Sequence, residues 1–479
     1  MATDFDQRCC VFSAVSGGTA HNAQFCYPGL DVGGAVEVTA SVTELGAAQR
    51  PGLAVAVIAD DLSGGADTGV SFARAGLDVA IQLDAAVEPP GWAQAVVLPT
   101  DSRDRGADEA SALVTDAVTA LARRRPALWY KKIDSTLRGH LGVELTATIQ
   151  GVRPDLTVLA PAFPAHGRTV SGGRGFLGGM PLEDTSTWQA QGMRGPADLP
   201  AMMRAAGLRV AALPLADIRS GLAAERLSAA AGAADVIVCD AESEDDLAAT
   251  AAAGALTGLH LLWAGSAGLA AHLAATLGEQ PGAHTGDKSR AKPCALPGPG
   301  NAWAQAPALV VVGSAAGAAG AQLRYLETRP GVRVIRVHPA AILDDRAGAG
   351  HDVASAAQAI GEAIAAGCDV AIGLVAQDAP GSRVLDPVIS RVVSAALGAL
   401  AGRFRDQVGG IAATGGDTAL AVLAACGVSV LCPVGEVVTG VPVCLAGHDD
   451  RPVVTKAGAF GGERVLAQSL DLLHGRDAG

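Results

Sequence analysis

Aromatic side chains are scarce in this sequence: Phe, Trp and Tyr together make up 3% of its 479 residues. Hydrophobic residues nevertheless make up 49% of the chain, so global disorder is excluded and the cores must be built mainly from Val, Leu, Ile and Ala. That composition suits parallel sheets covered by Ala-rich helices. At about 150 residues per domain, the length predicts two or three domains.

Positively charged residues are outnumbered by acidic ones, and the formal net charge is −13. Because binding to phosphate backbones requires clustered Lys and Arg, this charge argues against a nucleic-acid partner. The nine cysteines form no CxxC pair and no zinc-like Cys/His spacing, so we expect a reducing interior and no protein-bound metal. No apolar run approaches the roughly 20 residues that span a bilayer, which predicts no membrane partner. The first ten residues, MATDFDQRCC, lack the basic and apolar blocks of a secretory signal, so a cytoplasmic protein is expected.

Residues 1–50 show little periodicity, and we interpret them as an extension, either disordered or an overlong gene start, with no assigned function. From Leu53 onward, strands alternate with helical stretches such as Ala107–Ala122, which predicts a mostly parallel sheet with helices on both faces. The predicted strands of this first lobe are Leu53–Ala59, Ala95–Pro99, Leu128–Lys132, Thr157–Ala160, Arg209–Leu213, Val236–Cys239 and His260–Trp263.

Residues 278–307 are dominated by Pro, Gly and polar residues, which predicts a linker between two domains. The linker contains Gly286-Asp287-Lys288-Ser289, but this is no phosphate-binding Walker A loop, because its spacing is wrong and no strand precedes it. A second α/β unit starts at Ala308. Its predicted strands are Leu309–Val312, Val332–Val337, Val370–Leu374, Gly410–Ala413, Val428–Leu431 and Val453–Lys456.

The predicted organisation is therefore an extension at 1–50, a first lobe at 51–277, the linker at 278–307 and a second lobe at 308–479. The predicted fold class is α/β, with two layered α/β lobes, mostly parallel sheets and an active-site cleft between the lobes. In such sheets, ligands bind beyond the carboxyl ends of the strands.

Charged side chains follow three predicted strands of the first lobe. The first strand ends in Asp60-Asp61, where one acid can face the cleft while the other caps the next helix. Spacing alone leaves open that both acids only shape the turn. Arg103 follows the second strand, and it could grip a carboxylate with two hydrogen bonds or pair with a neighbouring acid.

The next strand runs into KKIDSTLRG at positions 131–139. Lys131, Lys132, Asp134 and Arg138 are too polar to be buried without partners. Either they form an internal network of ion pairs, or they recognise a small polyhydroxylated anion. Charge at three neighbouring strand ends favours the anion.

Three further segments carry glycine at the ends of predicted strands. The loop at 162–173 either closes over a ligand or is a long surface loop. In the second lobe, Gly313-Ser314 and the stretch Gly415–Thr418 each follow a strand and open a helix, where backbone N–H groups can bind phosphates. Together with the glycines of 456–462 they favour a nucleotide site.

In this order, these segments resemble the four-carbon acid sugar kinase family, bacterial ATP-dependent kinases of threonate, erythronate and related acids. The resemblance covers most of residues 53–473. It is carried by IADDLSGGADTG at 58–69, TDSR at 100–103, KKIDSTLRG at 131–139, APAFPAHGRT at 160–169, GS at 313–314, TGGDTA at 414–419, GEVVTGVP at 435–442 and KAGAFG at 456–461. The version with KKIDSTLRG looks most like the D-threonate/D-erythronate kinases.

The resemblance implies a sugar-acid-binding N-terminal lobe and an ATP-binding C-terminal lobe. It implies that Asp60, Arg103, Lys131, Lys132, Ile133 and Asp134 contact the acid, and charge matching adds Arg138. It implies that ATP is contacted by Ser314, Gly415, Gly416, Asp417, Thr418 and Gly458.

The activity expected from this likeness is phosphoryl transfer from ATP, with Mg²⁺ bridging its phosphates, to the terminal C4 hydroxyl of a four-carbon sugar acid. Lys131, Arg103 and Arg138 would hold the carboxylate, Asp60 and Asp134 would accept hydroxyl hydrogen bonds, and Asp60 would act as the base. Closure of the lobes would align the reactants and exclude water.

Alternatives are a 3-oxo-tetronate or other short sugar-acid kinase, and a non-catalytic sugar-acid sensor with the same fold. A nicotinamide-dependent dehydrogenase is disfavoured, because no GxGxxG fingerprint with a following ribose-binding acid appears at the first strand of the second lobe. The oligomeric state stays open, a homodimer included.

Overall fold

The structure is a computed structural model that describes residues 52–190, 193, 195–278, 301–313, 317–339, 342, 349–375, 387–458 and 460–476. The predicted extension at 1–50 lies outside the described residues, as do positions 279–300 of the predicted linker and Ser314. Among the described residues, no helix has the length and apolarity of a bilayer-spanning segment.

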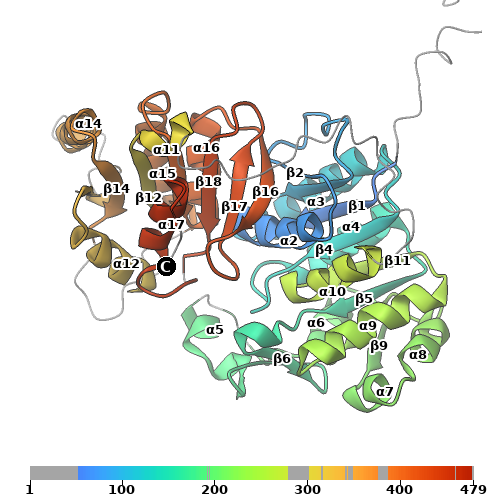
Figure 1. Cartoon of the computed structure of the whole chain (residues 1–479). Helices are drawn as coiled ribbons and strands as arrows, with labels where there is room; N and C mark the ends of the chain where they lie inside the picture. The colour runs from blue at the N-terminus through green and yellow to red at the C-terminus, as the bar shows by residue number, and fades with distance from the viewer. Residues whose placement is uncertain are drawn as a thin grey trace, which may run out of the picture. The chain divides into compact units, whose positions relative to one another are not determined.

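The strands of both predicted lobes join in one sheet of 15 strands (Figure 1). From one edge to the other its strands are β13 (Val332–Val337), β14 (Asp369–Leu374), β12 (Ala308–Val312), β15 (Gly410–Thr414), β18 (Pro452–Lys456), β17 (Pro442–Ala446), β16 (Val430–Glu436), β2 (Val79–Gln82), β3 (Ala95–Pro99), β1 (Val55–Ala59), β4 (Leu128–Lys132), β11 (Leu261–Gly265), β5 (Leu156–Ala160), β10 (Val236–Cys239) and β9 (Val210–Leu213). The α/β class with a mostly parallel sheet is thus confirmed, and the sequence did not reveal that the two halves share the sheet.

The junction between the halves is antiparallel. Val430 and Leu431 of β16 pair with Gln82 and Ile81 of β2, and β17 pairs antiparallel with both β16 and β18. Every other pairing in this sheet is parallel. The sequence analysis did not predict β2 or β17.

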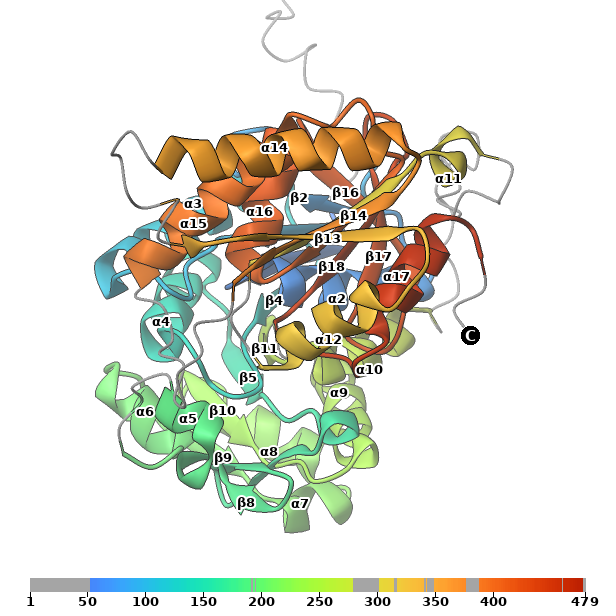
Figure 2. The ribbon, with the colours of Figure 1, turned by 90° about the vertical axis from the view of Figure 1, so that its left-hand side faces the viewer.

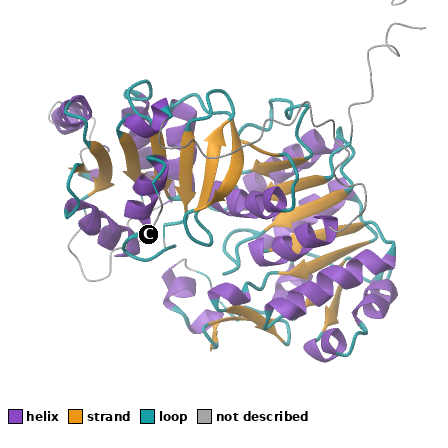
Figure 3. Ribbon diagram, viewed as in Figure 1, coloured by secondary structure: helices purple, strands orange, loops and turns teal. Residues whose placement is uncertain are grey.

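Helices cover both faces of the sheet (Figure 3). They are α2 (Leu62–Arg74), α3 (Ala107–Ala122), α4 (Leu141–Val152), α5 (Ser186–Ala190), α6 (Leu199–Ala205), α7 (Leu215–Arg219), α8 (Ala223–Ala230), α9 (Glu244–Thr257), α10 (Ala267–Gly278), α11 (Ala302–Gln305), α12 (Gly317–Glu327), α14 (Ala349–Ala365), α15 (Pro387–Gly402), α16 (Gly416–Ala425) and α17 (Val465–Leu473), with short 3₁₀ turns η1 (Pro164–His166) and η2 (Leu182–Asp184). In the C-terminal half, α14 lies beside β13 and β14, while α12 and α17 pack against each other (Figure 2).

The central strands are buried on both faces, which explains their nearly continuous apolar sequences. Every residue of β1, β3, β5, β12 and β15 is buried. Because the registers pair Ala59 with both Pro99 and Lys132, and Lys132 with Gly265, the strands of the N-terminal half end at one common edge. The polar segments that follow these strands are thereby gathered in one place.

A small antiparallel sheet projects after β5 and was not predicted. It consists of β6 (Arg168–Ser171), β7 (Arg174–Leu177) and β8 (Met180–Pro181). Its first strand lies within the Gly-rich loop 162–173, and two backbone hydrogen bonds between Phe163 and Arg168 hold the start of that strand.

Candidate active site

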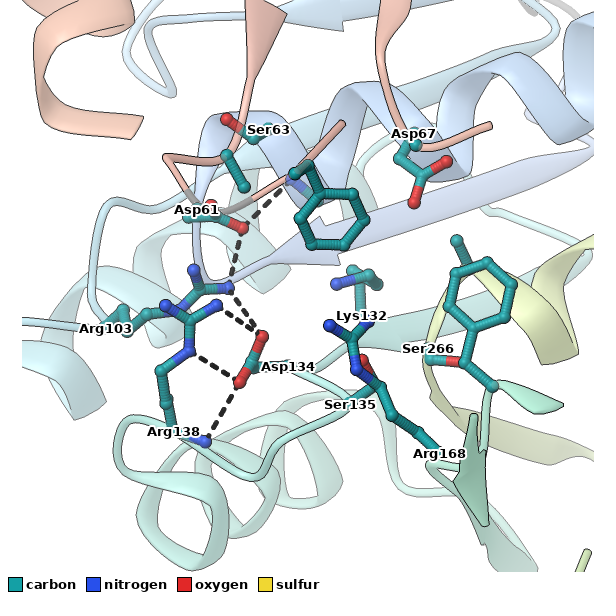
Figure 4. Close-up of a pocket in the computed structure, with 16 residues that line it drawn as sticks. Asp61, Ser63, Asp67, Arg103, Lys132, Asp134, Ser135, Arg138, Arg168 and Ser266 are labelled. Atoms are coloured by element: carbon teal, nitrogen blue, oxygen red, sulfur yellow. Dashed lines mark hydrogen bonds and ion pairs between the residues drawn. The ribbon is translucent and has the colours of Figure 1, made fainter. Parts of the chain in front are cut away.

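A pocket of about 410 Å³, open solvent included, lies where the N-terminal strands end (Figure 4). Three of its lining residues, Gly440, Ala457 and Phe460, come from the C-terminal half. The others come from the N-terminal half and are Asp61, Ser63, Gly64, Asp67, Arg103, Lys132, Asp134, Ser135, Arg138, Phe163, Arg168, Ser266 and Ala267. The pocket is therefore built by both halves of the chain.

The two lysines of KKIDSTLRG lie on opposite faces of β4, because successive strand residues alternate between faces. Lys132 lines the pocket, and its Nζ donates to the Ile133 carbonyl at 2.8 Å. Lys131 is fully buried on the other face, where its Nζ lies 2.7 Å from the Glu144 carboxylate of α4. Lys131 and Ile133 were predicted to contact the acid, but neither lines the pocket.

The two acids that follow β1 are both held by Arg103. Its Nε donates to Asp60 Oδ2 and its Nη2 to Asp61 Oδ1, each at 2.7 Å. Burial alone would raise the pKa of Asp60, but the charges of Arg103, Lys132 and Lys131 hold it below its ordinary value. Asp60 does not line the pocket, whereas Asp61 lines it and also caps α2 by accepting from the Gly64 N–H at 3.0 Å.

Asp134 and Arg138 form a second ion pair. Arg138 donates through Nε and Nη2 to the two carboxylate oxygens of Asp134, each at 2.7 Å, and Thr136 donates to the same carboxylate. Although Asp134 is buried, the charge of Arg138 holds its pKa well below the ordinary range. The sequence left open whether the charges of this stretch form an internal network of ion pairs or recognise an anion. The structure shows such a network, and the network lines the pocket.

Asp67 is the pocket carboxylate that the sequence reasoning overlooked. It lies on α2, and Figure 4 shows its carboxylate pointing into the pocket. Among the described residues it has no hydrogen-bond or ion-pair partner, in contrast to Asp61 and Asp134. Burial raises the pKa of Asp67 to about 7, with the negative charges of Glu436 and Asp61 adding to the rise and Lys132 opposing it. The available signal was its i, i+4 spacing from Ser63, which places both side chains on one helix face.

The glycine turns of the C-terminal half lie together. A Cβ added to Gly313 would come within 2.0 Å of Thr418 Oγ1, so Gly313 must remain a glycine for these two turns to adjoin. Gly415 has φ +97°, a conformation that favours glycine, and it precedes α16. The free backbone N–H groups at this helix start are suited to bind phosphate.

The turn that begins α16 also touches the substrate side of the site. A Cβ on Gly416 would lie 3.5 Å from Asp61 Oδ2, which places the turn in contact with the pocket wall. Burial raises the pKa of Asp417 to about 6, helped by the negative charges of Asp101 and Asp104. Gly458 lies after β18, where its carbonyl accepts from Lys456 Nζ at 3.3 Å. The structure thus brings the turn Gly415–Thr418 next to the pocket.

Gly64→Ala is expected to lower kcat/KM for the acid about 10- to 100-fold, because small displacements of positioning groups are costly. Its Cβ would lie 2.5 Å from Lys132 Nζ and 2.6 Å from Asp61 Oδ1, so both groups must move. We expect little net change in the free energy of unfolding, since a weakened cap offsets the gain from replacing a helical glycine. Steady-state kinetics and a thermal melt measure the two effects.

Gly91→Ala is the matched control, because a Cβ there meets nothing within 4 Å. Wild-type kinetics for Gly64→Ala would show that Lys132 and Asp61 are not needed in these positions.

Comparisons with known proteins identify two domain families along the chain. The family of sugar-binding N-terminal domains matches residues 55–273, and that of nucleotide-binding C-terminal domains matches residues 309–466. The D-threonate kinase of Cupriavidus necator is 40% identical over 423 residues, which cover 86% of this chain and 95% of that protein. The D-erythronate kinase of Heliobacterium modesticaldum is 29% identical over 457 residues, covering 88% and 97%.

A solved structure from Salmonella typhimurium, described as a putative tRNA synthase, superposes with a TM-score of 0.70 at 22% identity. The match covers 87% of this chain and 98% of that one, and it supports the fold alone. The family predicted from the sequence motifs is confirmed by the two domain matches and by the curated relatives. The chain belongs to the four-carbon acid sugar kinase family, whose curated relatives include kinases of D-threonate and D-erythronate.

Proposed function

We propose that this kinase transfers the γ-phosphoryl group of ATP to the C4 hydroxyl of D-threonate, with D-erythronate as the nearest alternative substrate. The relatives from Cupriavidus necator, Salmonella typhimurium and Bordetella bronchiseptica named D-threonate kinase support this choice, at 40%, 31% and 34% identity. A 3-oxo-tetronate kinase of Methylobacterium radiotolerans is less similar, at 28% over 449 residues.

The observation that carries the proposal is the pocket itself. It presents cations and the carboxylate of Asp67, which has no partner among the described residues, beside a turn suited to bind phosphate. A four-carbon acid offers one carboxylate for the cations and a row of hydroxyls for the carboxylates. Asp67 can accept a hydrogen bond from a hydroxyl without first losing another partner, whereas Arg138 already donates to both carboxylate oxygens of Asp134. Asp60 has one unpartnered oxygen, Oδ1, but that oxygen is buried and Asp60 does not line the pocket.

In the proposed reaction, the C4 hydroxyl oxygen attacks the γ-phosphorus, the bond to the β–γ bridging oxygen breaks, and ADP leaves. Asp67 accepts the hydroxyl proton, since a base whose pKa lies near the working pH is the most effective. The Gly415 N–H already donates to the Lys456 carbonyl at 2.9 Å, so the N–H groups of Gly416–Thr418 hold the phosphates. Arg103 fixes Asp61 against that turn. Phosphoryl transfer passes through a loose transition state, so positioning and charge stabilisation dominate the rate.

Mg²⁺ would neutralise the phosphates of ATP when bound. Among the described residues, no group of three or more His, Cys, Asp or Glu side chains could hold a metal ion. Mg²⁺ fits nevertheless, because it is usually held by one or two carboxylates together with substrate phosphates. Asp417, whose pKa is raised by burial and by two neighbouring acids, is the carboxylate on the phosphate turn that would hold it.

A panel of short sugar acids with ATP and Mg²⁺, followed by ADP release, tests the proposal. The highest kcat/KM is expected with D-threonate, followed by D-erythronate. If kcat/KM is highest with a 3-oxo-tetronate, that acid and not D-threonate is the substrate. Binding of acid and nucleotide without any ADP release would identify a sensor in place of a kinase.

A further inference from the structure

Four cations line the pocket, and two of them are already neutralised. The guanidinium of Arg103 contacts Asp60 and Asp61, and that of Arg138 makes two hydrogen bonds to Asp134. Their donors face protein carboxylates, so neither side chain is free to grip a substrate carboxylate in the same way. Charge matching predicted that Arg103 and Arg138 hold the substrate carboxylate. Because both are already paired, we expect another cation to bind it.

Arg168 and Lys132 are the two remaining cations of the pocket. Within the described part of the chain, neither makes an ion pair with a carboxylate. Arg168 is of special interest, because its buried Nε has no hydrogen-bond partner among the residues that the structure describes. A buried guanidinium N–H without a partner is costly, so it marks a place where a ligand atom is expected. Burial also lowers the pKa of Arg168.

The backbone holds Arg168 in a fixed place at the start of β6. Phe163 N–H donates to the Arg168 carbonyl at 2.7 Å, and Arg168 N–H donates back to the Phe163 carbonyl at 3.1 Å. Gly167, with φ +66°, makes the tight turn between them. The strand then pairs with β7, so the side chain starts from a rigid hairpin.

The guanidinium of Arg168 contacts a residue of the C-terminal half. Its guanidinium carbon lies 5.1 Å from the centre of the Phe460 ring, a cation–π contact between segments almost 300 positions apart in sequence. Figure 4 shows the guanidinium reaching into the same space as Lys132, across from Asp67. A four-carbon chain placed there would have cations at one end and the free carboxylate at the other.

We propose that Arg168 binds the carboxylate of the substrate and thereby makes the enzyme specific for sugar acids over neutral polyols, with Phe460 orienting its guanidinium. This inference rests on the proposed function. The planar fork of Arg matches a carboxylate with two parallel hydrogen bonds, which the single ammonium of Lys132 cannot do. Lys132 adds charge at the same end of the pocket.

The test measures equilibrium dissociation constants for D-threonate and for threitol, which carries a hydroxymethyl group where the acid has its carboxylate. Arg168→Gln is expected to weaken D-threonate binding about 100-fold, the loss of one charged hydrogen-bonded contact, and to change threitol binding less than about threefold. Arg168→Lys should lie between, because it keeps the charge but not the fork. KM for ATP should stay near the wild-type value.

Arg174→Gln is the matched control, since Arg174 lies on the neighbouring strand of the same hairpin, pairs with Glu183 and does not line the pocket. It should bind both compounds like the wild type. Equal weakening of acid and polyol by Arg168→Gln, or unchanged acid binding with a reduced kcat, would overturn the inference and indicate a contact to the polyol chain or to phosphate.

Failure of the inference about Arg168 can be distinguished from failure of the proposed function. If the wild type phosphorylates a sugar acid that Arg168→Gln binds equally well, only the inference fails. If the wild type turns over no sugar acid, the proposed function fails, while a loss of acid binding in Arg168→Gln would still support the carboxylate site.

Discussion

Asp67→Asn is expected to lower kcat about 10²- to 10⁴-fold, the usual contribution of a positioned general base. The substitution keeps the shape of the side chain and its ability to accept a hydrogen bond, but it removes the basic oxygen. Because Asp67 points into the pocket and has no hydrogen-bond partner in the described parts of the chain, the loss should appear in kcat more than in the affinity for the acid. Steady-state kinetics with the best acid of the panel measure both.

The pH dependence gives this prediction its sharpest form. A base must be deprotonated to act, and burial raises the pKa of Asp67 to about 7. In the wild type, kcat/KM should therefore rise with pH up to about 7 and level off above that value. In Asp67→Asn this rising limb of the pH profile should be absent, and kcat/KM should be low and independent of pH over the same range.

As pH rises through about 7, the stability of the wild type should fall while its activity rises. A carboxyl group whose folded-state pKa is raised stabilises the fold fully below its unfolded pKa, and that contribution is lost as pH rises through about 7. Above pH 7, the wild type carries a partly buried charge that Asp67→Asn removes. The variant should thus melt at a higher temperature than the wild type at pH 8, and the gap should close toward pH 4.

Asp60→Asn is the control, because Asp60 was the base predicted from the sequence and its pKa is held low by Arg103, Lys132 and Lys131. This variant should disturb the Arg103 network yet keep the limb near pH 7. The opposite pattern, with the limb lost in Asp60→Asn and kept in Asp67→Asn, would return the role of base to Asp60.

The sequence could place the site because strand ends are local features. Asp61, Arg103 and Lys132 each follow or end an apolar run, and parallel pairing brings such ends together without further information. The glycine turn at 415–418 is equally local. The motif order then identified the family, which the two domain matches confirm.

Other parts of the site depend on contacts between distant segments. Alternation along β4 dictates that only one of Lys131 and Lys132 faces the pocket, but the choice depends on whether α2 or α4 covers a given face. Arg168 is oriented by Phe460, and the two halves are joined through β2 and β16. Such pairings leave no periodic signal in either partner.

Lys131→Met is expected to lower the free energy of unfolding by about 3–5 kcal/mol, the usual result of removing one partner of a buried ion pair. Lys131 is 0% exposed and Glu144 is 2% exposed, so water cannot solvate the carboxylate left behind. Chemical denaturation of the purified variant measures the change. The folded fraction should bind the acid as the wild type does, because Lys131 does not line the pocket.

The double variant Lys131→Met/Glu144→Leu should recover most of that loss, since replacing a whole buried pair by apolar side chains is often neutral. Ser102, which donates to Glu144 Oε1 at 2.9 Å, keeps a partner in Thr100 Oγ1 at 2.8 Å. Lys132→Met on the opposite face should show the reverse behaviour, with weakened acid binding and no comparable loss of stability. A stable Lys131→Met protein that no longer binds the acid would restore Lys131 to the substrate contact that the family resemblance implies, and it would mean that β4 presents its other face to the ligand.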